Sequence, residues 1–195
     1  MNKITVIGGG AAGLMAAIAA AKNGAQVSLI EPNERLGKKI NITGKGRCNV
    51  TNDTDLEGLM AHIPRNGRFL YSALSRFTSR DTMAFFEGCG VPLKVERGDR
   101  VFPVSDSAFD ITDALKRQVK TLGVRWLHDR AASVETADGR VTAVTGETTS
   151  IFPGIRQMTV FSMPTTIPTA LTDSMLKTTD LSMSAFMQRH QAKLM

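Results

Sequence analysis

The residues with the clearest chemical meaning lie near the N-terminus, where Gly8-Gly9-Gly10-Ala11-Ala12-Gly13 matches the pattern G-x-G-x-x-G. In this pattern Gly8 lets the chain turn sharply out of a strand, and Gly10 lets the backbone approach a pyrophosphate without a Cβ in the way. Gly13 allows the following helix to pack closely on the sheet. The free N–H groups and the positive dipole end of a helix that begins near Ala11 would face the phosphates. The motif therefore predicts a dinucleotide site.

An acidic residue supports this interpretation. Glu31 follows a second strand-like segment, eighteen residues after Gly13, where a carboxylate can accept hydrogen bonds from a ribose hydroxyl pair. The same negative charge argues against a 2′-phosphate on the ligand, because like charges would meet. A glycine-rich turn without a ligand is the alternative, and the correct order of strand, turn, helix, strand and acid argues against it.

The elements that must position these residues can also be predicted. Residues 3–7 are a β-branched run of strand length, residues 11–23 form an alanine-rich helix that stops at Asn23-Gly24, and residues 26–30 form a second strand. This β-α-β unit predicts a parallel sheet in an α/β fold. Further helices are expected at 55–62, 66–76, 80–88 and 107–122, and further strands at 92–96, 100–102, 124–127, 131–136 and 140–145.

The segment 33–52 shows neither a helical nor a strand period and is strongly basic. A structureless loop of this length inside a compact domain is usually functional or disordered. Its residues 36–52, LGKKINITGKGRCNVTN, resemble the signature G-K-K-x-x-x-[ST]-G-x-G-R-C-N-x-T-N of a bacterial NAD(P)/FAD-dependent oxidoreductase family. That family is aminoacetone-oxidase-like and includes a bile-acid-dehydroxylation flavoprotein. Residues 100–108 look like a second block of the same family.

The resemblance has implications for fold and cofactor. It implies a Rossmann-like FAD-binding domain of the glutathione-reductase type, with a parallel sheet, helices and a small antiparallel β element. It implies FAD rather than NAD in the first site, with Lys39 and Arg47 near the phosphates and Gly44 and Gly46 allowing close backbone approach. It also places the backbone near Ala131 beside the adenine.

The implied activity is that of an FAD-dependent oxidoreductase in which the flavin performs the hydride or electron chemistry. A small organic molecule or NAD(P)H would be the substrate, and no catalytic side chain is assigned. Sixteen of the 17 glycines lie at or before Gly146, which predicts a boundary there between a nucleotide-binding domain at 1–146 and an atypical, disordered or frameshifted tail at 147–195. Because members of the family that the chain resembles are longer, the resemblance implies that the domain at 1–146 is partial. In that tail only a helix near 181–194 is expected. The alternative function is therefore a truncated dinucleotide-binding fragment without turnover.

The composition limits the remaining classes. The net charge of +6 suits an anionic ligand. The two cysteines make neither a disulfide framework nor a metal-binding cluster, so no metal and a reducing, cytoplasmic compartment are expected. No segment has the length of a transmembrane helix, and Gly8–Gly10 interrupts the one run that resembles a secretory signal. Cys48 is expected to be a packed loop residue rather than a redox thiol.

A group of arginines allows two interpretations. Arg65, Arg68, Arg76 and Arg80 recur along one stretch and could form a nucleic-acid face or a solvated helix surface. The solvated surface is favoured because no aromatic platform is expected among them. The expected partner is thus a small-molecule substrate, with no nucleic-acid or membrane partner. RNA binding stays open as a third function, and it would show an affinity that falls steeply with salt.

Overall fold

A computed structural model of the chain describes residues 2–65, 67–138, 140–148 and 159–161. The described residues form two compact units, the first from residues 2–40 and the described part of 115–161, and the second from residues 41–114 without residue 66. Within the described residues, no helix has the length and apolar character needed to cross a membrane.

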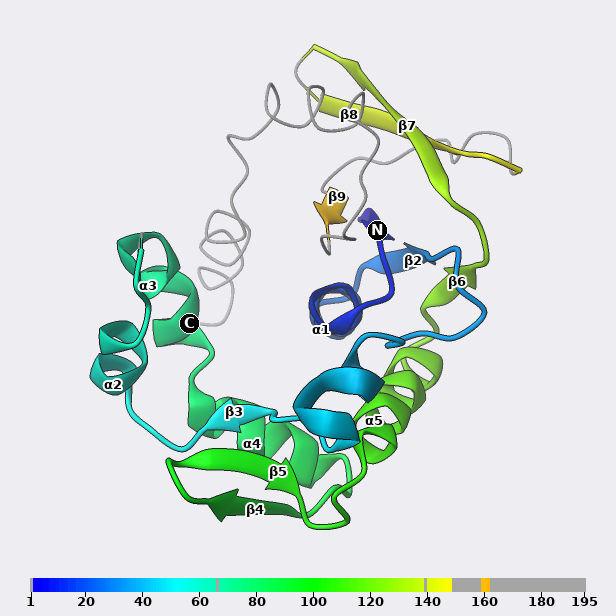
Figure 1. Cartoon of the computed structure of the whole chain (residues 1–195). Coiled ribbons are helices and arrows are strands. Elements are labelled where there is room, and N and C mark those ends of the chain that lie inside the picture. The colour runs from blue at the N-terminus through cyan, green and yellow to red at the C-terminus, as the bar shows by residue number, and fades with distance from the viewer. Residues whose placement is uncertain (1, 66, 139, 149–158, 162–195) are drawn as a thin grey trace. The chain divides into compact units, whose positions relative to one another are not determined.

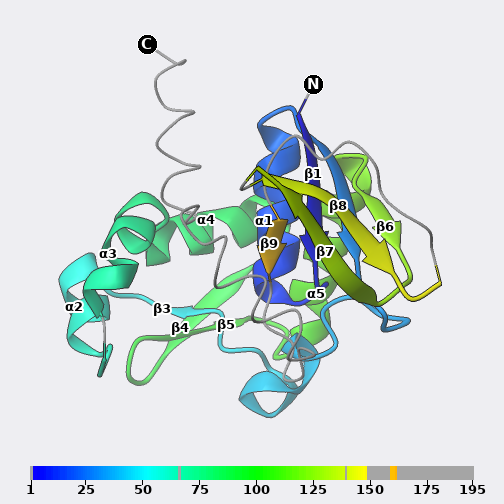
Figure 2. The ribbon, with the colours of Figure 1, turned by 90° about the horizontal axis from the view of Figure 1, so that it is seen from above.

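The first unit is built on a four-stranded sheet (Figures 1 and 2). Its strands are β1 (Lys3–Ile7), β2 (Gln26–Ile30), β6 (Arg125–Leu127) and β9 (Thr159–Phe161). They lie in the order β6-β2-β1-β9, and every neighbouring pair is parallel. All four strands therefore end at the same edge of the sheet.

The order of the strands changes direction at β1, which distinguishes the carboxyl end of β1 from the rest of that edge. The chain runs from β1 outward to β2 and β6 on one side, and its later strand β9 lies on the other side of β1. In open α/β sheets, ligands bind outside the carboxyl ends of the strands where the order reverses in this way. The carboxyl end of β1, where the glycine turn begins, is such a point.

The helix α1 (Ala11–Lys22) packs on this sheet through a face of small and aliphatic residues. Leu14 and Ala17 are fully buried, and Val6 of β1 and Leu29 of β2 are also fully buried. Gly13 is buried in the same face, so its missing side chain allows the close packing that the motif predicts. The helix ends at Asn23, and Gly24 follows with a φ of +77°.

A hairpin covers the carboxyl end of β2. It consists of β7 (Ala131–Ala137) and β8 (Arg140–Gly146), which pair in antiparallel register (Figure 1). Ala131 and Val144 form a buried cluster with Ile30, the last residue of β2. The buried carboxylate of Asp129 fixes the entry to the hairpin by accepting a hydrogen bond from the amide of Arg130 at 2.7 Å.

The second unit combines short helices with an antiparallel sheet (Figure 1). The strands β3 (Thr51–Asn52), β5 (Arg100–Pro103) and β4 (Leu93–Glu96) are neighbours in that order. The segment η1 (Ile40–Gly46) has 3₁₀ turns at its ends and a non-helical kink at residues 43–45. The helices are α2 (Leu56–Ala61), α3 (Gly67–Arg76), α4 (Ser79–Gly88) and α5 (Ala108–Thr121). The boundary between the two units falls within α5.

The sequence predicted most of these elements. The expected strands and helices between residues 3 and 146 are confirmed within one residue at either end. The segment 33–52 was expected to lack regular structure, but it contains η1 and β3, which are too short to show a period. No strand was expected after Gly146, and β9 contradicts that expectation. The helix expected near 181–194 lies outside the described residues, and the domain end at residue 146 stays a prediction.

The close contact between Gly146 and Asp129 leads to a stability prediction. A Cβ added to Gly146 would lie 2.0 Å from Asp129 Oδ2 and 2.7 Å from its Cγ, which are overlapping distances. Asp129 is buried and hydrogen-bonded, so it cannot move away freely. We expect Gly146→Ala to lower the free energy of unfolding by about 1–3 kcal/mol in a urea titration.

The control is Gly88→Ala, at the end of α4, where an added Cβ would meet nothing within 4 Å. Because alanine favours the helix, this variant should unfold at the same or a higher urea concentration than the wild type. Equal destabilisation by the two substitutions would contradict the tight contact at Gly146.

Candidate functional site

The glycine turn after β1 has the geometry that a phosphate requires. Gly8 has a φ of +97°, a conformation that favours glycine, and its amide donates to the carbonyl of Ile30 at 2.8 Å. Gly10 precedes α1 in an extended conformation and provides no side-chain cap. Ala11 and Ala12 are exposed. The first amides of α1, which have no partner within their own helix, therefore lie at an open surface.

The electrostatics of α1 favour an anion at this end. The first turn of the helix carries no acidic side chain, and Lys22 lies in its last turn. The helix dipole adds a partial positive charge at the N-terminus. Together with the exposed amides, this makes the turn suitable for a phosphate group.

Glu31 is held beside this turn by backbone and side-chain donors. Its Oε2 accepts a hydrogen bond from the amide of Gly9 at 2.6 Å, and its Oε1 accepts from the amide and the Nδ2 of Asn33 at 2.8 and 2.5 Å. A carboxylate has about four acceptor sites, so these contacts leave one site on Oε2 for a ribose hydroxyl. A second hydroxyl would have to replace one Asn33 contact.

Gly9 is a site residue that the motif alone does not identify, because the pattern allows any residue there. A Cβ on Gly9 would lie 2.4 Å from Leu36 Cδ2 and 2.9 Å from Glu31 Cγ. The absence of a side chain thus lets Glu31 approach the turn. The run of three glycines is the signal that could have indicated this. Nothing in the sequence pattern indicated Asn33.

The end of β6 adds two aromatic side chains near Glu31. Trp126 Nε1 donates to the carbonyl of Glu31 at 3.5 Å, and a ring nitrogen of His128 lies 2.8 Å from the carbonyl oxygen of Pro32. The two rings meet edge to face, with centroids 6.2 Å apart. Ala131 begins β7 in the same unit and is buried. Its predicted place beside the adenine stays a prediction.

The family-like loop has an unusual backbone. Gly44 and Gly46 have positive φ, a conformation that favours glycine, and Lys45 and Cys48 also have φ values of +57° and +58°. Non-glycine residues in this conformation cost about 1–3 kcal/mol each and concentrate at functional sites. Gly44 is exposed, and its Cβ position is 3.1 Å from the amide nitrogen of Asn49, so the turn is also tight.

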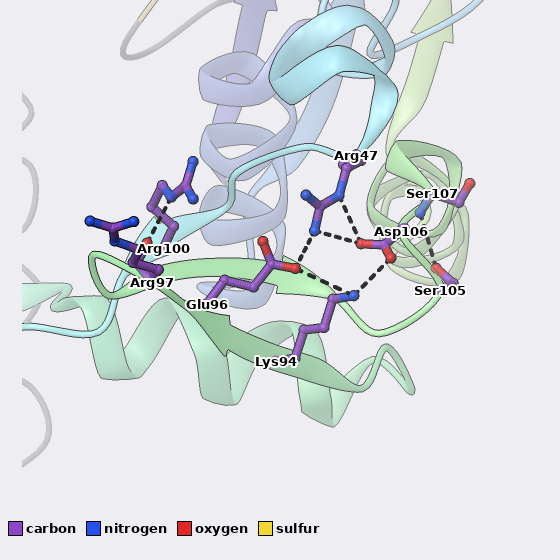
Figure 3. A network of polar contacts seen from close by, with 8 residues as sticks. All are labelled: Arg47, Lys94, Glu96, Arg97, Arg100, Ser105, Asp106 and Ser107. Carbon is purple, nitrogen blue, oxygen red and sulfur yellow. Dashed lines mark hydrogen bonds and ion pairs between the residues drawn. The ribbon is translucent and has the colours of Figure 1, made fainter.

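The two basic residues expected at the phosphates differ in environment. Lys39 lies in the first unit and is exposed. Arg47 lies in the second unit and pairs with two carboxylates, Glu96 and Asp106 (Figure 3). Hydrogen bonds from Arg47 lower the pKa of Glu96, while Lys94 is the main cause that lowers the pKa of Asp106. The expected phosphate contacts of Lys39, Gly44, Gly46 and Arg47 stay predictions.

Cys48 lies in the interior of this loop. It is buried, and burial raises the pKa of its thiol, although a side-chain hydrogen bond with Thr43 opposes the shift. A raised pKa keeps the thiol protonated and unreactive. This agrees with a packed residue rather than a redox thiol.

One premise about the arginine-rich stretch is wrong. No aromatic platform was expected among the arginines, but the side chains of Phe69 and Tyr71 on α3 are 79% and 55% exposed. Arg68 lies next to them and is exposed, as are Arg65 and Arg80, whereas Arg76 is only half-exposed. Exposed aromatic and basic side chains therefore occur on and near α3.

Comparison with known proteins places this geometry in a family. Residues 2–184 match the HI0933-like protein Rossmann domain. The chain belongs to this family of FAD-dependent oxidoreductases. The match covers most of the chain and continues past Gly146 into the segment that was expected to be an atypical tail.

Alignments with two curated relatives show what share of each relative this chain covers. The chain is 39% identical over 127 residues to the 3-dehydro-bile acid delta(4,6)-reductase of Clostridium scindens, which covers 64% of the chain and 30% of that protein. It is 33% identical over 123 residues to the ribosomal RNA dihydrouridine synthase of Haemophilus influenzae, which covers 63% of the chain and 30% of that protein. The chain thus spans about 30% of each matched relative.

Solved structures confirm the fold. The 3-ketosteroid-delta4-(5alpha)-dehydrogenase of Rhodococcus jostii aligns with a TM-score of 0.61 and 18% identity, covering 82% of this chain and 45% of that one. THI4 of Thermovibrio ammonificans aligns with a TM-score of 0.57 and 14% identity, covering 93% and 64%. The predicted α/β, Rossmann-like fold of the FAD-binding type is therefore confirmed.

The packing at Gly9 leads to a binding prediction. We expect Gly9→Ala to push Glu31 away from the turn and to weaken ADP binding by about tenfold or more, equivalent to about 1.4 kcal/mol. Isothermal titration calorimetry with ADP measures this effect. Gly88→Ala, the same change on an exposed helix, should leave ADP affinity unchanged. Equal affinities of the Gly9→Ala variant and the wild type would contradict the assigned role of Gly9.

Proposed function

We propose that the chain binds FAD, with the diphosphate on the first turn of α1 and the adenosine ribose at Glu31, and that it serves an FAD-dependent oxidoreductase. One observation carries the proposal: the Glu31 carboxylate is fixed at the glycine turn by Gly9 and Asn33 while Ala11 and Ala12 leave the adjacent amides open. The exposed amides at the start of α1 suit an anion, and the Glu31 carboxylate beside them suits a hydroxyl group of the same ligand.

The residues of the first unit fit the ADP half of the cofactor. Gly10 leaves space for a phosphate, the amides of Ala11 and Ala12 can donate to its oxygens, and Glu31 can accept from the ribose. The negative charge of Glu31 disfavours a ribose that carries a 2′-phosphate. The bound flavin would supply hydride or electron transfer, and NAD(P)H is a suitable co-substrate to reduce it.

The names of the two curated relatives suggest a reaction class. A delta(4,6)-reductase acts on carbon–carbon double bonds of a bile acid, and a dihydrouridine synthase produces a base whose ring double bond is reduced. Both names describe addition of hydrogen across a ring double bond. We propose this class of reaction for the enzyme that this chain serves, with a small organic molecule as the substrate.

Because the chain spans about 30% of these relatives, cofactor binding and turnover are separate questions. The alternative function is a dinucleotide-binding fragment without turnover. Such a fragment would bind ADP and FAD but would not oxidise NAD(P)H in the presence of an acceptor. Binding and NAD(P)H oxidation, measured on the same preparation, distinguish the two functions.

The cofactor proposal is tested with Gly10→Val. A valine at this position would occupy the space of the phosphate, so we expect FAD binding to become undetectable, whereas the wild-type chain should bind FAD at near one-to-one stoichiometry. Equilibrium dialysis followed by the flavin absorbance measures both. Ala61→Val, an exposed change at the end of α2, serves as the control and should bind as the wild type does. Undiminished binding by Gly10→Val would refute the site.

RNA is a second candidate substrate, and a specific observation supports it. Phe69 and Tyr71 are exposed beside Arg68 on α3, and single-stranded nucleic acids stack their bases on such aromatic side chains while arginines contact the phosphates. The ribosomal RNA dihydrouridine synthase of Haemophilus influenzae is a relative whose name specifies an RNA product. This candidate reverses the expectation that nucleic acid is not a partner.

The RNA candidate predicts that Phe69→Ala weakens binding of a single-stranded RNA oligonucleotide by about fivefold or more, because one stacked base contributes about 1–3 kcal/mol. Fluorescence anisotropy at two salt concentrations measures the affinity, which should fall steeply as salt rises. Phe109→Ala removes another exposed ring, on α5, and is the control. Equal effects of the two variants, or no binding at low salt, would leave the small-molecule substrate as the better proposal.

A further inference from the structure

We infer that the indole of Trp126, on β6, stacks against the base of the bound dinucleotide. The inference deepens the proposed function and rests on it, because it extends the same ligand site from the ribose to the base. All the residues that carry it, from the glycine turn to His128, belong to the first unit.

The carboxyl ends of three strands lie level at one edge of the parallel sheet. Ile7 of β1 pairs with Ile30 of β2, and Ile30 pairs with Leu127 of β6. The glycine turn follows the first of these residues, Glu31 follows the second and His128 follows the third. Neighbouring strands lie about 5 Å apart, so the three strand ends form a row with Glu31 in the middle.

This row has the same order as the parts of an ADP group. The phosphates suit the turn after β1, and the ribose hydroxyls suit Glu31 after β2. In a nucleotide the phosphate and the base are attached at opposite ends of the ribose, so in an extended ligand the base continues away from the phosphates. A ligand that follows the strand order β1-β2-β6 therefore carries its base to the end of β6.

The indole of Trp126 is held at this strand end. Its Nε1 donates to the carbonyl oxygen of Glu31 at 3.5 Å, which directs the ring toward the end of β2. It also meets the ring of His128 edge to face, with centroids 6.2 Å apart. That imidazole is itself anchored, because a ring nitrogen lies 2.8 Å from the carbonyl oxygen of Pro32.

The same indole is available for stacking. Trp126 is 39% exposed, and His128 beside it is also exposed. The two rings are inclined by 62°, so the pair leaves ring faces uncovered. An aromatic side chain binds a base through its flat face and needs no charge to do so. The end of β6 thus offers an uncharged, flat group at the place where the base is expected.

The fluorescence of Trp126 tests the contact directly, since it is the only tryptophan of the chain. We expect saturating ADP to lower the acrylamide quenching constant of this emission by about half, because a stacked base covers one of the two faces of the indole. Inorganic pyrophosphate carries no base and should leave the constant unchanged. Equal protection by the two ligands would show a change that does not depend on the base and would overturn the inference.

Two substitutions of Trp126 separate stacking from hydrogen bonding. Trp126→Leu removes the ring, and we expect it to weaken ADP binding by about fivefold or more in isothermal titration calorimetry. Trp126→Phe keeps an aromatic ring but lacks the donor to Glu31, and it should retain most of the affinity. If the indole served only to hold the carbonyl of Glu31, both variants would lose the same affinity, and that result would overturn the inference.

Phe109→Ala is the control for the loss of an exposed ring. Phe109 lies on α5, in the second unit, and is 53% exposed. This variant should bind ADP with wild-type affinity and show the same protection of Trp126. A loss of affinity equal to that of Trp126→Leu would show a general effect of removing an exposed ring and would contradict the assigned contact.

The outcomes distinguish this inference from the proposed function. A wild-type chain that binds neither ADP nor FAD would overturn the proposed function and this inference with it. Binding of ADP in the calorimeter without protection of Trp126 would overturn this inference alone. The melting temperature of each variant shows whether weaker binding comes from unfolding.

Discussion

The hydrogen bond from the amide of Gly9 to the carboxylate of Glu31 is the constraint on which the candidate site depends. It joins the turn after β1 to the residue that follows β2, at the edge where the order of the parallel strands reverses. A buried carboxylate is stable only when donors satisfy it, and Gly9 and Asn33 do so here. Because Gly9 has no side chain, the Glu31 carboxylate can approach the glycine turn closely enough to hydrogen-bond to its backbone.

The sequence predicted those elements whose local residue pattern favours the same conformation that the folded protein adopts. The run 3–7, the alanine-rich helix and Glu31 each carry a local signal, and the structure places them as predicted. The strand β9 could not be predicted, since three residues show no period and the pairing with β1 decides its conformation. The contacts of Glu31 with Asn33 and of Arg47 with Glu96 depend on packing between segments that no spacing rule connects.

The resemblance predicted the family correctly, but a signature does not say what each of its residues does. Gly44 and Gly46 have the backbone conformation for which glycine is suited, and this follows from residue type. Arg47 looks like a phosphate ligand as long as its neighbours are unknown. In the folded unit it pairs with the carboxylates of Glu96 on β4 and of Asp106 after β5, which are 49 and 59 residues later in the chain, and they change the chemistry that it can perform.

The position of β9 has a consequence for how the protein folds during synthesis. Thr5 of β1 pairs with Thr159, so the central strand of the parallel sheet lacks one neighbour until more than 150 residues have left the ribosome. Parallel pairings between such distant segments form slowly because a long loop must close first. Until then one edge of β1 offers unpaired backbone groups to other chains. Among the strands that the structure describes, the last to be synthesised is thus the one that covers this edge of β1.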